Sequence, residues 1–186
     1  MKVVIGVTGK FGSGKSTVAK ILEKKGAKVI KVDEIGHEVL KDEEVKRKLL
    51  KVFGEEIFEN EKVNRKMLGN IVFSSEERLK ELEKLLHPRM VEKVRKIIEK
   101  LDGVVVLEAA ILKRMKLDSL CDHIITVVAD EEKIFERMRK KGFSDDEIRK
   151  RLSFQEDVEP TGIILINNGS LEELEEKVNM VWSLMI

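Results

Sequence analysis

Residues Gly9–Ser16 read GKFGSGKS, a glycine-rich segment that ends in a lysine and a hydroxyl side chain. The spacing matches the phosphate-binding pattern G-x-x-x-x-G-K-[ST], in which backbone N–H groups and a helix N-terminus surround an anion. We expect Lys15 to reach the β- and γ-phosphates of a nucleotide and the Ser16 hydroxyl to bind Mg²⁺. A glycine-rich turn without a ligand is the alternative. The β-branched run VVIGV before the loop and the helical pattern after it favour the phosphate site.

Two carboxylates come at the ends of apolar runs. Asp33 is predicted to end the second strand, where it could orient an acceptor hydroxyl and take its proton. A helix N-cap is an alternative role for Asp33, and the two roles can coexist. Glu108 is predicted to end the third strand, either holding a Mg²⁺-bound water or serving as an ordinary loop glutamate. Glu34 and His37 are weaker candidates.

Basic residues are concentrated in the stretch ERMRKKGFSDDEIRKRLSFQ. The pattern predicts two helices joined by Lys141–Ser144, a hairpin that could close over a nucleotide and surround the moving phosphate with cations. Solvated helix faces are the alternative, since nearby acidic residues could balance some of the charge. We expect Arg137 and Arg151 to point inward.

Five continuous apolar runs indicate strands that are covered on both faces, as in a parallel sheet. Helical patterns separate them, which predicts an α/β three-layer sandwich with functional residues beyond the carboxyl ends of the strands. The predicted strands are Val3–Val7, Lys28–Val32, Val104–Leu107, Ile124–Val128 and Ile163–Ile166.

The segment between the second and third strands, about 33–102, is too long for one crossover helix. It either covers the sheet or shapes the site of an acceptor substrate, and long insertions beside a site favour the second reading. Within it Pro88 is predicted to start the second of two leucine-patterned helices, which explains the His87–Pro88 pair without catalysis. Capping boxes are predicted at Ser74 with Glu77, Ser144 with Glu147, and Ser170 with Glu173.

The composition indicates one globular domain over residues 1–186. Basic and acidic residues nearly balance, at 36 and 35, so we expect neither nucleic acid nor a membrane surface as a partner. One cysteine, Cys121, excludes an internal disulfide and fits a reducing cytoplasm. We find no secretory or membrane-spanning segment and no sign of an obligate protein partner.

In this order, these residues resemble the dephospho-coenzyme A kinase family of P-loop kinases over nearly the whole chain. The matching stretches are TGKFGSGKST at Thr8–Thr17, KVDEIGH with Asp33 and His37, Arg65 with Leu68, the pair His87–Pro88, EAAIL from Glu108, Arg137, Arg151 with Gln155, and Asn167 with Gly169, Ser170 and Leu174. The chain departs from the family pattern at Lys10, Lys31, Glu108, Ala110, Lys141 and Thr161–Gly162.

The resemblance implies transfer of the γ-phosphate of ATP to the ribose 3′-hydroxyl of dephospho-coenzyme A, the last step of coenzyme A synthesis. It implies a five-stranded parallel sheet formed by a core of residues 1–32 and 103–186, a helical acceptor insert at about 33–102 and a lid at about 137–155. The implied catalytic residues are Asp33 as base and Lys15, Arg137 and Arg151 as phosphate-stabilising cations. The implied ATP-binding residues are Gly9, Lys10, Phe11, Gly12, Ser13, Gly14, Lys15, Ser16, Thr17, Asn167 and Gly169, with Ser16 on Mg²⁺. The implied acceptor residues are Thr8, Asp33, His37, Arg65, His87 and Glu108.

Two other functions compete with this one. A P-loop kinase could act on another small acceptor, such as a nucleoside monophosphate or shikimate. A regulatory ATPase or nucleotide switch would need no acceptor, but such proteins commonly carry a D-x-x-G segment after the third strand, and this chain lacks one there.

Overall fold

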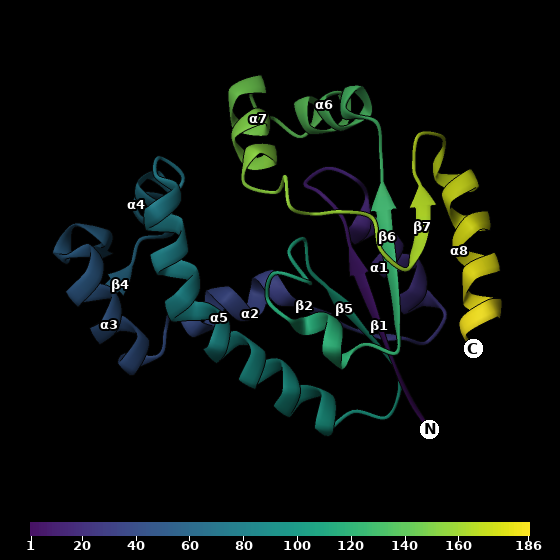
Figure 1. Cartoon of the computed structure of the whole chain (residues 1–186), viewed down its shortest axis with the longest axis horizontal. Helices are drawn as coiled ribbons and strands as arrows, with labels where there is room; N and C mark the ends of the chain where they lie inside the picture. The colour runs from purple at the N-terminus through teal and green to yellow at the C-terminus, as the bar shows by residue number, and fades with distance from the viewer. The chain divides into compact units, whose positions relative to one another are not determined.

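The structure is a computed structural model that describes all 186 residues (Figure 1). The chain forms two compact units, one made of Met1–Lys31 with Ile98–Ile186 and the other of Val32–Ile97. We call the first the sheet unit and the second the helical unit, and describe each by itself. None of the helices is both long enough and apolar enough to span a bilayer.

The sheet unit is built on a five-stranded sheet in the order β2-β5-β1-β6-β7, in which every neighbouring pair is parallel. The predicted α/β fold with five parallel strands is therefore confirmed. The register sets Glu108 of β5 beside both Val7 of β1 and Lys31 of β2, so the carboxyl ends of these strands meet at one edge. The strands are β1 (Lys2–Thr8), β2 (Lys28–Lys31), β5 (Gly103–Glu108), β6 (His123–Val128) and β7 (Ile163–Ile166).

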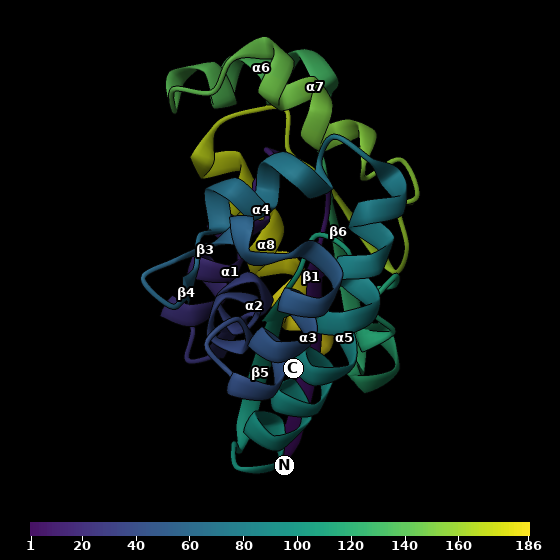
Figure 2. The same ribbon diagram turned by 90° about the vertical axis from the view of Figure 1, so that its left-hand side faces the viewer.

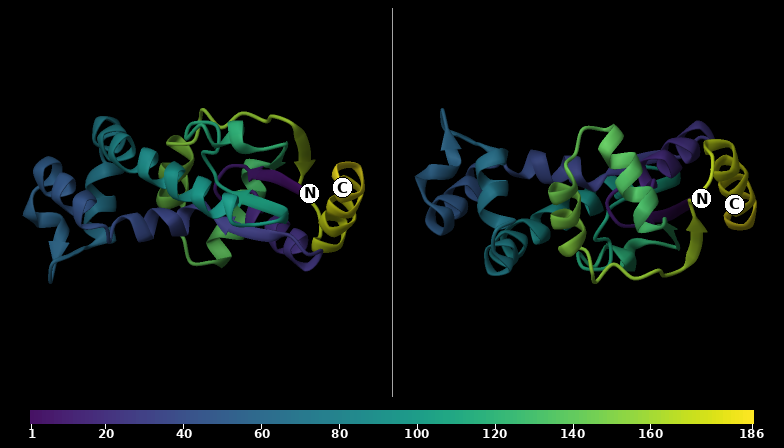
Figure 3. Two further views of the ribbon diagram at one scale, coloured as in Figure 1. Left: turned by 90° about the horizontal axis from the view of Figure 1, so that it is seen from below. Right: turned by 90° about the horizontal axis from the view of Figure 1, so that it is seen from above.

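One face of this sheet is covered by α1 (Lys15–Lys24) and α8 (Leu171–Met185), the helix drawn in yellow beside β7 in Figure 3. Ile5, Val7 and Ile125 of the sheet have no exposed surface and belong to the same buried cluster as Leu22 of α1 and Val178 of α8. These β-branched strand residues and the apolar helix faces explain why the loop between β1 and α1 has a rigid base.

The segment after β5 is packed tightly against β1. Leu112 is almost fully buried, and a Cβ added at Gly6 of β1 would come within 2.7 Å of its Cδ2 atom and 2.9 Å of the Cys121 Sγ atom. Gly6 therefore lets this segment approach the central strand closely. Cys121 follows the short 3₁₀ helix η2 (Leu117–Leu120) and is partly buried.

Two helices, α6 (Glu131–Lys140) and α7 (Asp145–Ser153), lie side by side after β6 (Figure 2). Ile134, Phe135, Met138 and Ile148 form their shared core. The predicted capping box at Ser144 is confirmed, since Ser144 and Glu147 bond each other's backbone N–H groups.

The helical unit contains a small two-stranded hairpin among its helices. Buried Val39, Leu49, Ile57, Leu68 and Val94 supply much of its interior. Its elements are α2 (Val32–Val39), α3 (Glu43–Phe53), η1 (Glu55–Ile57), β3 (Phe58–Glu59), β4 (Lys62–Val63), α4 (Arg65–Val72) and α5 (Glu76–Glu99).

Two predicted helix boundaries are wrong in this region. Pro88 does not start a helix but lies inside the 24-residue helix α5. Proline in a helix interior removes one backbone hydrogen bond, and burial of Leu86 and Met90 on either side of Pro88 offsets that loss. Ser74 is not the N-cap of α5 either. At this end of the helix the backbone N–H of Arg78 donates to the hydroxyl of Ser75.

Candidate active site

The phosphate-binding loop joins the end of β1 at Thr8 to the start of α1 at Lys15. Gly14 precedes the helix with φ 107°, a left-handed conformation that glycine adopts without steric cost. Gly14 has no side chain that could cap the helix N-terminus, and no acidic residue lies in the first turn. The first-turn N–H groups and the positive end of the helix dipole are thus arranged for an anion, with Lys15 and Ser16 as the first helical residues.

Asn167 lies directly after β7 and supports the phosphate-binding loop through its side chain. Its side-chain Nδ2 donates to the Ser13 carbonyl at 2.8 Å, and the residue is only 8% exposed. A Cβ added at Gly14 would come within 2.2 Å of the same Nδ2 atom, so Gly14 is required by close approach as well as by φ. The amide of Asn167 is therefore used to shape the loop, and its role in binding ATP stays a prediction.

Ser16 and Glu108 bring a hydroxyl and a carboxylate together beside the phosphate-binding loop. The Ser16 hydroxyl donates to Glu108 Oε1 at 2.6 Å, and the second carboxylate oxygen, Oε2, is buried without a hydrogen-bond partner. A hydroxyl and a carboxylate are hard oxygen ligands, and Mg²⁺ commonly takes only one or two protein ligands beside phosphates and water. These residues fit the ion, although no group of three or more acidic, histidine or cysteine side chains is present to form a cage.

Arg137 of α6 faces the end of β7. Its Nη2 donates to the Asn167 carbonyl at 2.6 Å, while its Nη1 is buried and has no partner. A buried, unpaired guanidinium nitrogen is costly unless a ligand completes it, and a phosphate oxygen would do so. Arg137 is thus partly buried as expected, and its contact with phosphate stays a prediction.

Arg151 of α7 lies over two aromatic rings. Its guanidinium carbon is 4.8 Å from the ring centre of Phe11 in the phosphate-binding loop and 5.0 Å from that of Phe143. The two rings also meet edge to face at 5.1 Å. These contacts are cation–π interactions, which orient the guanidinium. Arg151 is exposed, so its cationic role toward phosphate stays a prediction.

Thr8 and Gly169 differ in their surroundings. The Thr8 side chain is buried, and its hydroxyl donates to the Ala110 carbonyl at 3.0 Å, so it joins β1 to the segment after β5. Gly169 is exposed in the turn before α8. The roles of Thr8 toward the acceptor and of Gly169 toward ATP stay predictions.

In the helical unit, Asp33 and His37 both belong to α2, where they are exposed and one turn apart. Asp33 was expected to end a strand, but β2 ends at Lys31 and α2 begins at Val32. The expectation failed because buried Val32 extends the apolar run of β2 by one residue while serving as the first residue of the helix. Asp33 in the first turn is favourable for the helix dipole.

Arg65 and His87 lie on two other helices of the same unit. Arg65 is the exposed first residue of α4, whose N-cap Asn64 accepts the N–H groups of Lys66 and Met67. His87 is half-buried in α5, directly before Pro88. The roles of Arg65 and His87 in binding an acceptor stay predictions.

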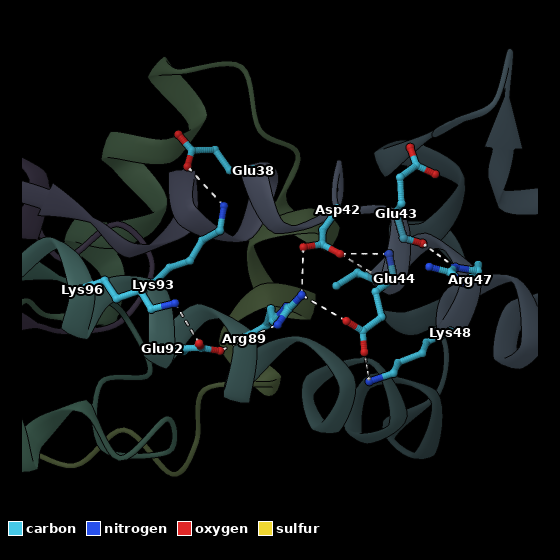
Figure 4. Close-up of polar contacts among 11 residues, drawn as sticks. Glu38, Asp42, Glu43, Glu44, Arg47, Lys48, Arg89, Glu92, Lys93 and Lys96 are labelled. Carbon is cyan, nitrogen blue, oxygen red and sulfur yellow. Dashed lines mark hydrogen bonds and ion pairs between the residues drawn. The ribbon is translucent and has the colours of Figure 1, made fainter.

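An ion-pair network ties the helices of this unit together (Figure 4). Asp42 caps α3 by accepting the N–H groups of Glu44 and Val45, and it also accepts from Arg89 of α5 at 3.1 Å. The backbone N–H of Val45, followed by that of Glu44 and by Arg89, holds the pKa of Asp42 below its usual value. Arg89 reaches Glu44 as well, at 3.2 Å. A groove of about 470 Å³ lies between α3 and α5, lined by Glu44, Val45, Lys48, Val52, Glu81, Lys84, Leu85, Pro88 and Arg89.

Two pairings near the phosphate-binding loop escaped sequence reasoning. Arg114 binds Asp157, 43 residues away, and Phe143 joins Phe11 around Arg151. Neither pairing has a local sequence signal, because each depends on how distant segments meet. The glutamine in the stretch RLSFQ was a usable signal: Gln155 Oε1 accepts the Phe11 backbone N–H at 2.7 Å.

The chain is similar to known proteins over nearly its whole length. A protein-family model described as dephospho-CoA kinase matches residues 3–173. Dephospho-CoA kinase of Fusobacterium nucleatum is 33% identical over 95% of this chain and 95% of its own length. That of Aquifex aeolicus is 34% identical over 96% and 95%. A crystal structure from Thermus thermophilus superposes with a TM-score of 0.83 at 30% identity, covering 100% of this chain and 98% of the other. A shikimate kinase from Bacteroides thetaiotaomicron shares the fold, with a TM-score of 0.57 at 18% identity over 98% and 97% of the two chains.

Proposed function

This chain belongs to the dephospho-CoA kinase family, and from that premise we propose that it transfers the γ-phosphate of ATP to the ribose 3′-hydroxyl of dephospho-coenzyme A. It is a kinase and therefore a transferase, and the family makes ATP the phosphate donor. The observation that carries the proposal is the phosphate-binding loop with its open helix N-terminus beside the Ser16–Glu108 contact. A nucleotide triphosphate with its metal ion matches that set of donors and acceptors.

The reaction forms one bond and breaks one. The 3′-oxygen of the acceptor attacks the γ-phosphorus, the bond from that phosphorus to the β,γ-bridging oxygen breaks, and ADP leaves. We assign Asp33 as the base that takes the hydroxyl proton, which suits an exposed carboxylate at a helix start. Lys15, Arg137 and Arg151 would hold the charge that spreads over the transferred phosphoryl group.

We propose that Mg²⁺ is held by Ser16 and by Glu108. The ion would supply positive charge to the β- and γ-phosphates. The buried, unpartnered Oε2 of Glu108 supports this assignment, since a bound ion or its water would satisfy that oxygen. Glu108 departs from the family pattern, and its side chain reaches the Ser16 hydroxyl.

We further propose that the helical unit binds the acceptor through Asp33, His37, Arg65 and His87. Dephospho-coenzyme A carries an adenosine, a pyrophosphate and a long pantetheine arm, so it needs more contact surface than a nucleoside monophosphate. Binding energy far from the reacting hydroxyl should raise kcat as well as lower KM, because it orients that hydroxyl. A reducing cytoplasm suits the single cysteine and is the location that we propose.

The test is a coupled ADP-release assay with Mg²⁺ and ATP against dephospho-coenzyme A, adenosine, AMP, CMP, UMP and shikimate, with mass spectrometry of the product. We expect kcat/KM for dephospho-coenzyme A to exceed that for adenosine or AMP by about a thousandfold, or roughly 4 kcal/mol of transition-state binding. Preference for a monophosphate or shikimate would contradict the proposed acceptor. ADP release that no acceptor stimulates would indicate an ATPase instead.

A further inference from the structure

Arg114 binds the segment that follows α6 and α7. Its Nε donates to Asp157 Oδ2 at 2.8 Å and its Nη2 to Asp157 Oδ1 at 2.5 Å, a two-pronged pair. The same Nη2 donates to the Phe154 carbonyl at 2.5 Å. The guanidinium holds the pKa of Asp157 below its usual value, first through the hydrogen bond between them. A planar guanidinium that binds a carboxylate and a carbonyl fixes both distance and direction.

Arg114 itself stands on a firm base. It lies in a turn closed by the bonds from Met115 N–H to the Ile111 carbonyl and from Leu117 N–H to the Leu112 carbonyl. Leu112, Met115 and Leu117 are all at most 5% exposed. The buried neighbours and the hydrogen bonds leave the backbone of this turn little freedom to move. The hydrogen bonds of Arg114 therefore fix residues 154–157 relative to the sheet.

The contacts continue from there into the phosphate-binding loop. Gln155 lies between the two residues that Arg114 holds, and its Oε1 accepts the Phe11 N–H at 2.7 Å. The Thr8 hydroxyl, at the root of the same loop, donates to the Ala110 carbonyl just before the turn that carries Arg114. Hydrogen bonds thus join the phosphate-binding loop, the turn that carries Arg114 and residues 154–157 to one another. A cavity of about 120 Å³ lies among Thr8, Ala110, Arg114 and Asp157.

We propose that Arg114 is a positioning residue for the nucleotide site: by holding Phe154 and Asp157 it keeps Gln155 on the Phe11 N–H and so fixes the shape of the phosphate-binding loop. The inference rests on the proposed use of this loop for ATP and adds to it. Arg114 acts on the loop through Gln155. Losing the hydrogen bonds of Arg114 should therefore weaken ATP binding while leaving the acceptor site unchanged.

The test compares Arg114→Gln and Asp157→Asn with the double reversal Arg114→Asp with Asp157→Arg. In each single variant we expect hydrogen exchange of the Phe11 amide to rise at least tenfold and the Kd for ATP, measured by calorimetry, to rise about tenfold. The KM for dephospho-coenzyme A should stay within about twofold. The double reversal should recover at least about threefold of the lost ATP affinity, because the ion pair re-forms while the bond to the Phe154 carbonyl does not.

The matched control is Arg139→Gln. Arg139 makes the same two-pronged pair, to Asp145 at 2.7 and 2.9 Å, but that pair joins α6 to α7 and does not include residues 154–157. We expect its ATP affinity and Phe11 exchange to stay within about twofold of the parent. Asp157 is half-exposed, so we expect Asp157→Asn to stay folded even if Arg114→Gln does not. The Kd for ATP and the exchange rate of the Phe11 amide are measured without an acceptor. They therefore test this inference even if the proposed acceptor is wrong.

Two outcomes would overturn it. One is a folded Arg114→Gln or Asp157→Asn variant whose Phe11 exchange and ATP affinity match the parent. The other is faster exchange spread evenly over the sheet amides, with no recovery in the double reversal, which would make Arg114 a stabilising residue only.

Discussion

Replacing Asn167 by aspartate separates support of the phosphate-binding loop from recognition of adenine. The change keeps the shape of the side chain but replaces its NH₂ donor by an oxygen. In the native protein that donor bonds the Ser13 carbonyl at 2.8 Å in a site that is 8% exposed. In Asn167→Asp two oxygens would face each other there, and neither could donate.

The cost can be worked from these contacts. The lost hydrogen bond contributes about 1 kcal/mol, and a buried carbonyl left without a partner costs about 1–3 kcal/mol more. A total of about 3 kcal/mol corresponds to roughly a hundredfold change in an equilibrium constant. Because the strain falls on the loop that must surround the phosphates, we expect this loss in nucleotide affinity.

The assay is calorimetric titration with Mg²⁺-ATP and, separately, with inorganic tripolyphosphate, which has phosphates but no adenine. We expect both affinities to fall by roughly the same factor, about a hundredfold. The control is Asn168→Asp, since Asn168 accepts the Asp130 N–H through its oxygen at 2.8 Å and a carboxylate can accept that bond as well. This neighbour should keep both affinities within about threefold.

A lower affinity of Asn167→Asp for ATP but not for tripolyphosphate would contradict this prediction, because Asn167 would then act on adenine. Unchanged affinities in a folded variant would contradict it as well, because the loop would then not depend on this bond.

Four further predictions follow from the site. Lys15→Ala should lower kinase activity at least a hundredfold with the urea midpoint of unfolding unchanged, since contacts of a lysine with the β- and γ-phosphates are worth several kcal/mol in the transition state. Near-normal turnover would contradict the phosphate site. Asp33→Asn should lower kcat by about a hundredfold or more with ATP affinity nearly constant; loss of ATP binding with kcat retained would make Asp33 a structural or metal residue. Amides of the lid helices at 131–153 should exchange more slowly with ATP and acceptor bound than in the free protein, and equal protection in both states would make them a fixed surface. Burial, with smaller effects of two nearby aspartates, raises the pKa of the Cys121 thiol from 9.0 to about 12, so iodoacetamide should label it at least tenfold more slowly at pH 8 in the folded protein than in urea. Its folded pKa lies above the unfolded one, so its contribution to stability is complete below pH 9.0 and is lost as the pH rises toward 12; equal labelling in both states would contradict this burial.

The sheet could be predicted from the sequence because its strands are continuous apolar runs, and such runs indicate a parallel sheet covered on both faces. Helix boundaries were harder to predict from the sequence. The local preference of Pro88 for a first turn predicts a helix start there, but packing of Leu86 and Met90 keeps α5 continuous through it. At Val32 the apolar run of β2 continues into α2, so composition alone could not separate the strand from the helix.

Within the site, the loop was predictable because its function requires a fixed local spacing of glycine, lysine and serine. The contact between Ser16 and Glu108 depends on β1 and β5 being neighbours, which the sequence does not state. The Arg114–Asp157 pair is less accessible still, because surface arginines and aspartates are common and any two of them could be partners. Only the fold selects this pair.

The pairing of β2 with β5 joins segments that are far apart in the chain. Lys28 and Lys31 lie beside Val105 and Glu108, so these strands meet only after the whole helical unit has been looped out between them. Closing so long a loop of disordered chain is entropically costly, and contacts of this sequence separation slow folding. Within the helical unit, α2 and α5 are joined by the pair of Glu38 with Lys93. If these helices dock first, they shorten the effective loop, so variants that loosen them should slow refolding of the sheet even where the native sheet is unchanged.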